Sequence, residues 1–159
     1  MDDALSAIHT SGHRALRKGR ISLPGTVYLV TATTFERQAL FGHFAGACVV
    51  AATFESRTLL GTNRLLAWVL MPDHAHWLIQ LGAGERLEAS IGRLKAVSSR
   101  NFNCRLGREG KVWAPAFHDR GLRREEDLRR VARYVVANPL RAGLVRRVGD
   151  YPFWNAVWL

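Results

Sequence analysis

Cysteine is scarce in this chain of 159 residues, which contains only Cys48 and Cys104. Two cysteines outside any C-x-x-C pair do not build a disulfide framework, so a reducing, cytoplasmic setting is expected. The acidic start, Met1-Asp2-Asp3, lacks the charged-then-apolar pattern of a secretion signal. No apolar run approaches the length of about eighteen residues that would indicate a membrane span. A glycine-rich phosphate loop and a Walker motif are also missing, which argues against nucleotide hydrolysis and against a nucleotide cofactor.

Acidic side chains are few relative to basic ones. Asp and Glu number 13 against 23 Lys and Arg, which gives a formal net charge of +10. Nearly all of the basic residues are arginine, whose planar guanidinium suits forked phosphate contacts and stacking on bases. A plainly basic, solvated surface is the alternative interpretation. The high and clustered positive charge favours a nucleic-acid partner and an association with the nucleoid.

The length fits one domain, and an apolar fraction of 48% is enough to fill its core. We interpret residues 1–20 as a flexible basic arm and residues 21–159 as a single domain with an aromatic C-terminal tail. Alternating and helical hydrophobic patterns predict strands over 27–34, 65–70, 74–81 and 112–122, helices over 45–60, 87–102 and 125–137, and the aromatic tail over 150–159. This order predicts an α+β fold, a ferredoxin-like antiparallel sheet with helices packed on it.

Two histidines, His74 and His76, stand two residues apart in a predicted strand that follows a tight turn. Because side chains alternate along a strand, both imidazoles point to one face, while Ala75 and Trp77 point to the other. Two imidazoles on a rigid strand make half of a metal site. The alternative is a pair of partly exposed histidines with ordinary hydrogen bonds. Leu78 occupies the third alternating position, which excludes a histidine-triad nucleotide hydrolase.

Tyr134 lies on the flank of the apolar stripe of the predicted helix 125–137. Asn138 follows four residues later, about 40° around a helix, so both side chains can enter the same space. A phenol has an ordinary pKa of about 10, so attack on a phosphodiester requires a nearby cation or a base. A metal held by the histidine pair and Asn138 could supply that cation, and Arg130 and Arg133 could offset developing charge. The alternative is a tyrosine that packs its ring and exposes its hydroxyl.

Two long segments resemble a known family. Met71–Ile79 (MPDHAHWLI) resembles the HUH motif of single-strand tyrosine transposases. Ala132–Val145 (ARYVVANPLRAGLV) is similar to the tyrosine helix of the bacterial REP-associated tyrosine transposases, a branch of the HUH single-strand (Y1) transposases. Trp113–Arg124 and the closing Asp150-Tyr151-Pro152 also look like that branch, and the similarity runs from about residue 20 to residue 159.

This resemblance implies a Y1 transposase-like catalytic domain of the HUH endonuclease type. Its members are metal-dependent endonucleases and strand transferases that act on single-stranded DNA next to a REP-like hairpin. By resemblance, Tyr134 forms a 5′-phosphotyrosine bond and frees a 3′-hydroxyl, while His74, His76 and Asn138 hold Mg²⁺ or Mn²⁺. The resemblance also implies no ATP and a monomer, with a dimer as the alternative.

Further residues are expected to contact DNA, although a solvated surface role is the alternative for each of them. The first group lies in the arm and the second accompanies the tyrosine helix: Arg14, Arg17, Lys18 and Arg20, then Arg120, Arg123, Arg124, Arg130, Arg133 and Arg141. The aromatic tail could stack on unpaired bases, but we expect it to dock on the core, as large aromatic side chains usually do.

Two other functions remain open from the sequence. One is a protein that binds hairpin DNA without cutting it. The other is a relaxase or rolling-circle replication initiator, which shares the HUH chemistry but usually belongs to a larger chain. A covalent adduct between Tyr134 and DNA separates a cutting enzyme from a binding protein.

Overall fold

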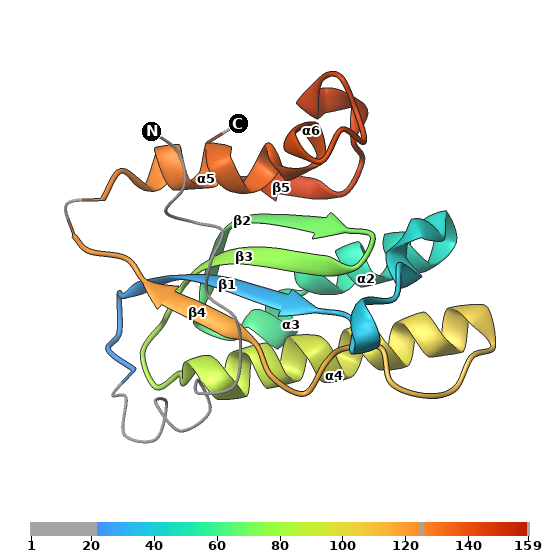
Figure 1. The fold of residues 1–159 in the computed structure, drawn as a ribbon. Helices are drawn as coiled ribbons and strands as arrows, with labels where there is room; N and C mark the ends of the chain where they lie inside the picture. The colour runs from blue at the N-terminus through green and yellow to red at the C-terminus, as the bar shows by residue number, and fades with distance from the viewer. Residues whose placement is uncertain (1–21, 125, 159) are drawn as a thin grey trace.

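The structure is a computed structural model, which describes residues 22–124 and 126–158 of the chain. An antiparallel sheet of five strands forms its centre, in the order β4-β1-β3-β2-β5 (Figure 1). The strands are β1 Val27–Thr33, β2 Arg64–Met71, β3 His74–Gln80, β4 His118–Gly121 and β5 Trp154–Ala156. The helices are α2 Phe44–Phe54, α3 Arg57–Leu60, α4 Leu87–Leu106, α5 Leu128–Val136 and α6 Asn138–Arg141. The predicted ferredoxin-like α+β fold is thereby confirmed, and the predicted basic arm lies outside the described residues.

Helices cover both faces of the sheet, with α4 on one side and α5 on the other (Figure 1). The α4 side holds the larger core, where buried side chains of β3 such as Trp77 and Ile79 pack with Phe54 of α2 and with Ile91 and Phe102 of α4. Aromatic edge-to-face contacts strengthen this packing, as between Phe54 and Trp77 with ring centroids 5.0 Å apart. We call this the core face of the sheet.

The opposite face is covered by α5, which contributes small and branched side chains. Ala132 and Val136 of α5 pack against Leu78 of β3 and Ala67 of β2. Leu78 is fully buried, and it lies in line with His76 and His74 because every second residue of a strand faces the same way. We call this the site face, since it carries the histidine pair.

The β2–β3 hairpin positions the histidines with respect to β1. Met71 pairs with His74 across the hairpin, as the sequence around Pro72 and Asp73 predicted. The Thr34 backbone N–H donates to the Asp73 carbonyl at 2.9 Å, and the Thr34 hydroxyl donates to the same oxygen at 3.1 Å. The hairpin turn is therefore fixed to the end of β1.

Three elements differ from the sequence prediction. The helix expected over 45–60 is two helices, because Glu55 and Ser56 leave the helix between Phe54 and Arg57; the Glu55 carboxylate accepts from Trp68 at 2.6 Å. The strand expected over 112–122 pairs as a strand only at His118–Gly121, since Pro115 has no N–H to donate and Trp113 makes an isolated bridge to Thr34.

The third difference is the aromatic tail, which contains a strand. Trp154–Ala156 pair with β2 and extend the sheet, and Phe153 is buried in the core. The Tyr151 hydroxyl donates to the Leu70 carbonyl at 2.6 Å. The expectation that the tail docks is confirmed. In the described residues, no helix combines the length and the apolar character needed to cross a membrane.

Candidate active site

The two histidines of β3 lie side by side on the site face. Their ring centroids are 4.9 Å apart and the ring planes are nearly perpendicular, at 83°. Both side chains are partly buried. The alternation that places them together also buries Ala75 and Trp77 on the core face, as the sequence predicted.

Each ring is fixed through its Nδ1 atom by a different partner. His74 Nδ1 lies 2.6 Å from the Asp73 carboxylate, and His76 Nδ1 lies 2.7 Å from the Thr31 hydroxyl. Thr31 is the residue of β1 directly opposite His76 in the sheet, so strand register alone brings the two together. With Nδ1 engaged on both rings, Nε2 is the nitrogen that each can offer to a metal.

His76 is held in its neutral form. Burial, together with the neighbouring His74 and the positive charges of Arg141 and Arg37, lowers the pKa of His76 from 6.5 to about 3. Near neutral pH the ring therefore carries a lone pair, which is the form that coordinates a metal.

The end of α5 lies over the strand residues that pair with the histidines. Val135 of α5 packs against Val69 and Met71 of β2. Those two residues stand opposite His76 and His74, respectively, in the β2–β3 ladder. Tyr134, the neighbour of Val135 in the chain, thus lies on the same face and at the same end of the sheet as the histidine pair.

Asn138 is oriented by a proline. In a continuous helix the N–H of residue 139 would bond the carbonyl of Val135, but Pro139 has no N–H. The Asn138 side-chain amide takes its place and donates to the Val135 carbonyl at 2.9 Å. Helix α5 therefore ends at Val136 and α6 begins at Asn138, and the remaining Asn138 amide oxygen is an acceptor that could serve as a ligand.

Tyr134 differs from the two other tyrosines of the chain. Tyr28 packs against the core-face cluster, across the sheet from the histidines. The Tyr151 hydroxyl is bonded to Leu70, and burial raises the pKa of Tyr151 to about 12, which disfavours a phenolate. Tyr134, by contrast, is 44% exposed.

An arginine holds the Tyr134 ring in place. The guanidinium carbon of Arg141 lies 3.8 Å from the ring centroid, and Arg141 also donates to the Tyr134 carbonyl at 2.8 Å. The sequence had assigned the charge near Tyr134 to Arg130 and Arg133, which are exposed on α5. The described contact to the ring instead comes from Arg141 of α6, the short helix that follows α5.

The donor set can be compared with what a metal requires. Among residues 22–124 and 126–158, no group of three or more His, Cys, Asp or Glu side chains is placed to hold a metal ion. Two imidazoles could form a site only with another kind of ligand, such as the amide oxygen of Asn138 together with water. Such a mixed set with open positions is compatible with a divalent cation that keeps several waters.

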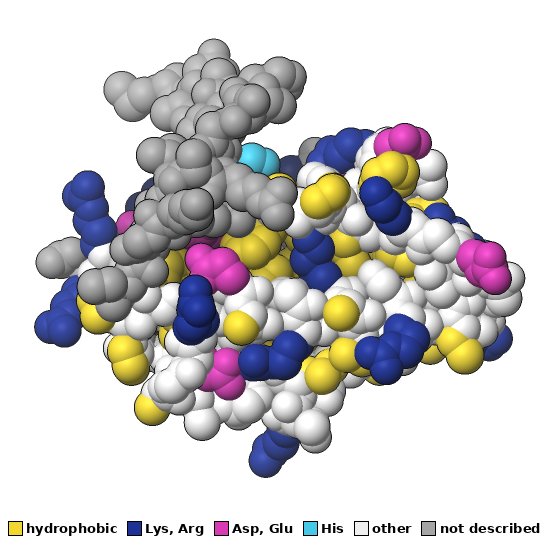
Figure 2. Space-filling model, turned by 90° about the horizontal axis from the view of Figure 1, so that it is seen from below, with side chains coloured by type: hydrophobic (Ala, Val, Ile, Leu, Met, Phe, Trp, Pro, Cys, Tyr) yellow, Lys and Arg dark blue, Asp and Glu magenta, His cyan; other side chains and the backbone are white. Residues whose placement is uncertain are grey.

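The arginines expected to contact DNA fall into two groups. Arg14, Arg17, Lys18 and Arg20 lie outside the described residues. The second group belongs to the β4–α5–α6 segment and is exposed to solvent: Arg120, Arg123, Arg124, Arg130, Arg133 and Arg141. Arg120 pairs with Glu126 at 2.9 Å, and Figure 2 shows that basic side chains also occur on the α4 side of the molecule.

Sequence reasoning missed three residues around the histidines: Thr31, Arg37 and Asp73. Asp73 stands directly before His74 in the chain, and its acidic character was the available signal. Thr31 is found only from strand register, and Arg37 is found only from its ion pair with Asp73, with 3.1 Å between the charged atoms.

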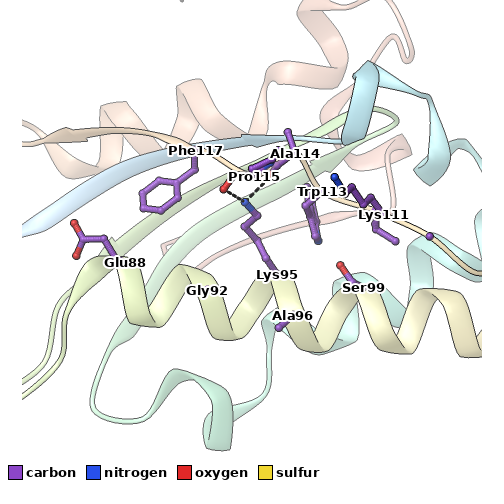
Figure 3. A pocket seen from close by; sticks show the side chains of 12 residues that line it. Glu88, Gly92, Lys95, Ala96, Ser99, Lys111, Trp113, Ala114, Pro115 and Phe117 are labelled. Carbon is purple, nitrogen blue, oxygen red and sulfur yellow. Dashed lines mark hydrogen bonds between the residues drawn. The ribbon is translucent and has the colours of Figure 1, made fainter. Parts of the chain in front are cut away.

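Lys95 of α4 lies away from the histidine pair. It lines an open groove between α4 and the segment before β4, together with Trp113 and Phe117 (Figure 3). Its amine donates to the Ala114 carbonyl at 2.6 Å. Helix α4 covers the core face, so Lys95 is separated from the histidines by the sheet.

Comparison with known proteins matches the part of the chain that carries these residues. The family model described as "Transposase IS200 like" matches residues 28–138, a span that contains both histidines, Tyr134 and Asn138. A REP-associated tyrosine transposase of Escherichia coli K12 is 31% identical over 87 residues, which cover 55% of this chain and 50% of that protein. A relative from Haemophilus influenzae is also 31% identical, over 98 residues that cover 55% of this chain and 56% of the other. The matched region thus spans about half the length of these curated relatives.

A solved structure has the same fold. A REP-associated tyrosine transposase bound to a REP hairpin superposes with a TM-score of 0.66 at 22% identity, over 85% of this chain and 79% of that chain. The resemblance seen in the two sequence motifs is confirmed by the family model and by these relatives. The chain belongs to the IS200-like transposase family.

Proposed function

We propose that this protein cuts and rejoins single-stranded DNA beside a hairpin, using Tyr134 as the nucleophile and a divalent metal held by His74, His76 and Asn138. One observation carries the proposal. Tyr134, which is exposed and whose ring is contacted by Arg141, lies at the end of the sheet where the imidazoles of His74 and His76 share one face.

The proposed step exchanges one phosphoester for another. The Tyr134 oxygen attacks the phosphorus, a bond from phosphorus to the tyrosine forms, and the bond to the 3′-oxygen of the preceding nucleotide breaks. The phenolic proton is released as the new bond forms, and the departing 3′-oxygen takes up a proton to become a hydroxyl. The energy of the phosphoester is kept in the 5′-phosphotyrosine, so rejoining needs no ATP.

The protein's own residues prepare this step. Asp73 and Thr31 hold the imidazoles of His74 and His76 so that Nε2 of each remains available. A bound cation would polarise the phosphate and stabilise the charge that develops on it. Two imidazoles suit Mn²⁺ better than Mg²⁺, because Mg²⁺ prefers oxygen ligands.

One similar solved protein is bound to a REP hairpin, which supports hairpin DNA as the partner proposed here. The net charge of +10 supports a polyanionic partner of this kind. In this proposal the basic arm and the six arginines of the β4–α5–α6 segment follow the DNA backbone, and the protein acts as a monomer. Membership of the IS200-like family argues against a relaxase or a replication initiator.

The three tyrosines provide a matched test. A labelled oligonucleotide that folds as a hairpin with single-stranded flanks, taken from palindromic repeats of the source genome, is incubated with the full chain and Mn²⁺. The adduct that survives denaturant is quantified for the unaltered protein and for Tyr28→Phe, Tyr134→Phe and Tyr151→Phe. We expect the adduct to disappear only in Tyr134→Phe.

Two results contradict the proposal. An adduct that persists in Tyr134→Phe would show that Tyr134 is not the nucleophile. Tight binding of the hairpin without any adduct, in protein that also binds Mn²⁺, favours a hairpin-DNA binding protein that does not cut.

A further inference from the structure

The turn after β1 has an unusual backbone next to the site. Glu36 and Arg37 both have positive φ, of 55° and 57°, and neither is glycine. Non-glycine residues in this left-handed region cost on the order of 1–3 kcal/mol each and persist only where the surroundings impose them. Two such residues in succession, beside the histidine pair, indicate that the surrounding structure fixes the position of this turn.

Several contacts impose the strained turn. The Thr34 hydroxyl donates to the Gln38 carbonyl at 2.7 Å and so closes the turn from within. The Phe35 backbone N–H donates to the Val112 carbonyl at 2.9 Å, and the Lys111 ammonium lies 4.9 Å from the Phe35 ring centroid. These contacts hold the backbone of the turn. The Arg37 side chain takes no part in them; it is 59% exposed and contacts Asp73.

Arg37 reaches the histidine pair through Asp73. The guanidinium contacts one oxygen of the Asp73 carboxylate at 3.1 Å, and the other oxygen contacts His74 Nδ1 at 2.6 Å. A guanidinium has five N–H donors, so one contact with Asp73 leaves others for a further anion. Arg37 therefore lies on the β1 side of the histidine pair and has N–H donors that the contact with Asp73 does not use.

Arg141 approaches the same pair from the other side. It belongs to α6, which follows the helix that packs on β2, and it covers the ring of Tyr134. In the sheet, β3 lies between β1 and β2. The two guanidinium groups therefore come to the histidines of β3 from opposite neighbours, and both charges act on His76.

We propose that Arg37 and Arg141 bind the same DNA phosphate, the one attacked by Tyr134, from opposite sides of the histidine pair. The inference rests on the proposed function and adds the groups that hold the reacting phosphate. Arginine binds phosphate oxygens with paired, charge-assisted hydrogen bonds. Two guanidinium groups would align the phosphorus with the Tyr134 hydroxyl and offset the charge that develops as the bond forms.

The alternative is that Arg37 only secures the hairpin turn through Asp73 and that Arg141 only secures the Tyr134 ring. That alternative predicts folding or stability effects without any link to one particular phosphate. The test therefore has to identify which phosphate each arginine contacts, independently of cutting.

A phosphate-neutralisation scan does this. The flank of the hairpin oligonucleotide is prepared as a series, each member with one methylphosphonate, which removes a single negative charge. Binding is measured with Mn²⁺ in a Tyr134→Phe background, where no strand is cut. Arg37→Asn and Arg141→Ala are added separately; Asn tolerates the left-handed region, so the turn is preserved. Arg105→Ala, on the exposed end of α4, is the matched control.

We expect one position at which methylphosphonate weakens binding by about tenfold in the background protein. At that position the effect should shrink to about twofold or less in both Arg37→Asn and Arg141→Ala, and stay at about tenfold in Arg105→Ala. Thermal unfolding of the variants shows that they are folded. In protein with Tyr134 restored, the adduct should map to that same phosphate.

Several outcomes overturn the inference. The two variants lose sensitivity at different phosphates, or at none, or at a phosphate other than the one joined to Tyr134. If the restored protein forms no adduct on DNA that it binds, the cutting function fails, while the scan still decides whether both arginines share one phosphate. If no oligonucleotide in the series is bound, both proposals fail.

Discussion

The two faces of strand β3 differ in burial and in polarity. On the core face, Ala75, Trp77 and Ile79 are fully buried among the aromatic and aliphatic side chains of α2 and α4. On the site face, His74 and His76 are partly buried and bonded to polar groups. One strand thus anchors the fold with every second residue and builds the site with the residues between.

The difference between the two faces explains how the protein tolerates a site whose own contribution to the free energy of folding is unfavourable. Burying an imidazole that must stay neutral, and holding two residues with positive φ, both cost free energy. The apolar burial on the other side of the same strand offsets those costs. Substitutions that act on one face only should therefore separate function from stability.

The largest effect is expected from His76→Ala on the site face. Loss of this imidazole should abolish tight Mn²⁺ binding and lower adduct formation by roughly 1,000-fold, because one of the two imidazole ligands is gone. The free energy of unfolding should change by only about 1 kcal/mol, the worth of the hydrogen bond to Thr31. Mn²⁺ titration, adduct yield and urea unfolding measure the three quantities. Unchanged Mn²⁺ affinity would remove His76 from the ligand set.

Trp77→Ala, one residue further along the chain, should do the opposite. The indole is fully buried and contacts Phe54 and Trp113, so its removal leaves a large cavity. The expected loss is about 3–5 kcal/mol in the free energy of unfolding. Measured at low temperature, where the variant is still folded, its Mn²⁺ affinity should remain close to that of the unaltered protein. A stability loss below about 1 kcal/mol would contradict the packing described for this face.

The pH dependence of stability sharpens the comparison further. In metal-free protein the pKa of His76 is about 3, against 6.5 for an ordinary histidine, so the unfolded chain binds the extra proton between those values. Stability should therefore decrease as pH falls from about 6.5 towards 3, with His76 contributing up to about 1.4 kcal/mol per pH unit. Urea unfolding at pH 7, 6 and 5 should show a shallower decrease for His76→Gln. Equal slopes in the two proteins would mean that His76 is not buried in its neutral form.

The smallest effects are expected from two glycines of the core-face helices. A Cβ on Gly46 of α2 would lie 2.5 Å from the buried ring of Phe102, whereas a Cβ on Gly92 of α4 would meet nothing within 4 Å. Gly46→Ala should destabilise by about 1–3 kcal/mol through overpacking. Gly92→Ala should stabilise by about 0.5–1 kcal/mol, the gain in helix propensity. Thermal unfolding of both variants checks the pair, and a neutral Gly46→Ala would show that α2 and α4 are less tightly packed than described.

Much of the fold was predictable because the signals are local. The strands around Val27, Leu66 and Trp77 follow from alternating or β-branched residues, and the hairpin follows from the turn at Pro72 and Asp73. The helix that carries Tyr134 follows from its apolar stripe. The tail strand at Trp154 was missed because three residues have too short a pattern to distinguish a strand from a loop.

The site was predictable only in part. His74, His76, Tyr134 and Asn138 were found because they lie in two continuous segments, and the structure brings both segments to one face. The partners Thr31 and Arg37 were not found, since each comes from a separate segment and meets the histidines only after the strands pair. Metal binding and the roles of these residues in cutting DNA remain predictions for the experiments above.

The sequence by itself determined which side chains share a strand face and which share a helix face, because those relations depend on the repeat of a single element. It also determined the family, through two long motifs. The tertiary structure alone decided that α5 covers the face opposite α4, that Arg141 folds back onto Tyr134, and that a strained turn brings Arg37 to the histidines. The first and the third depend on the packing of segments far apart in the chain, and the second, although it spans only seven residues, depends on the break between α5 and α6.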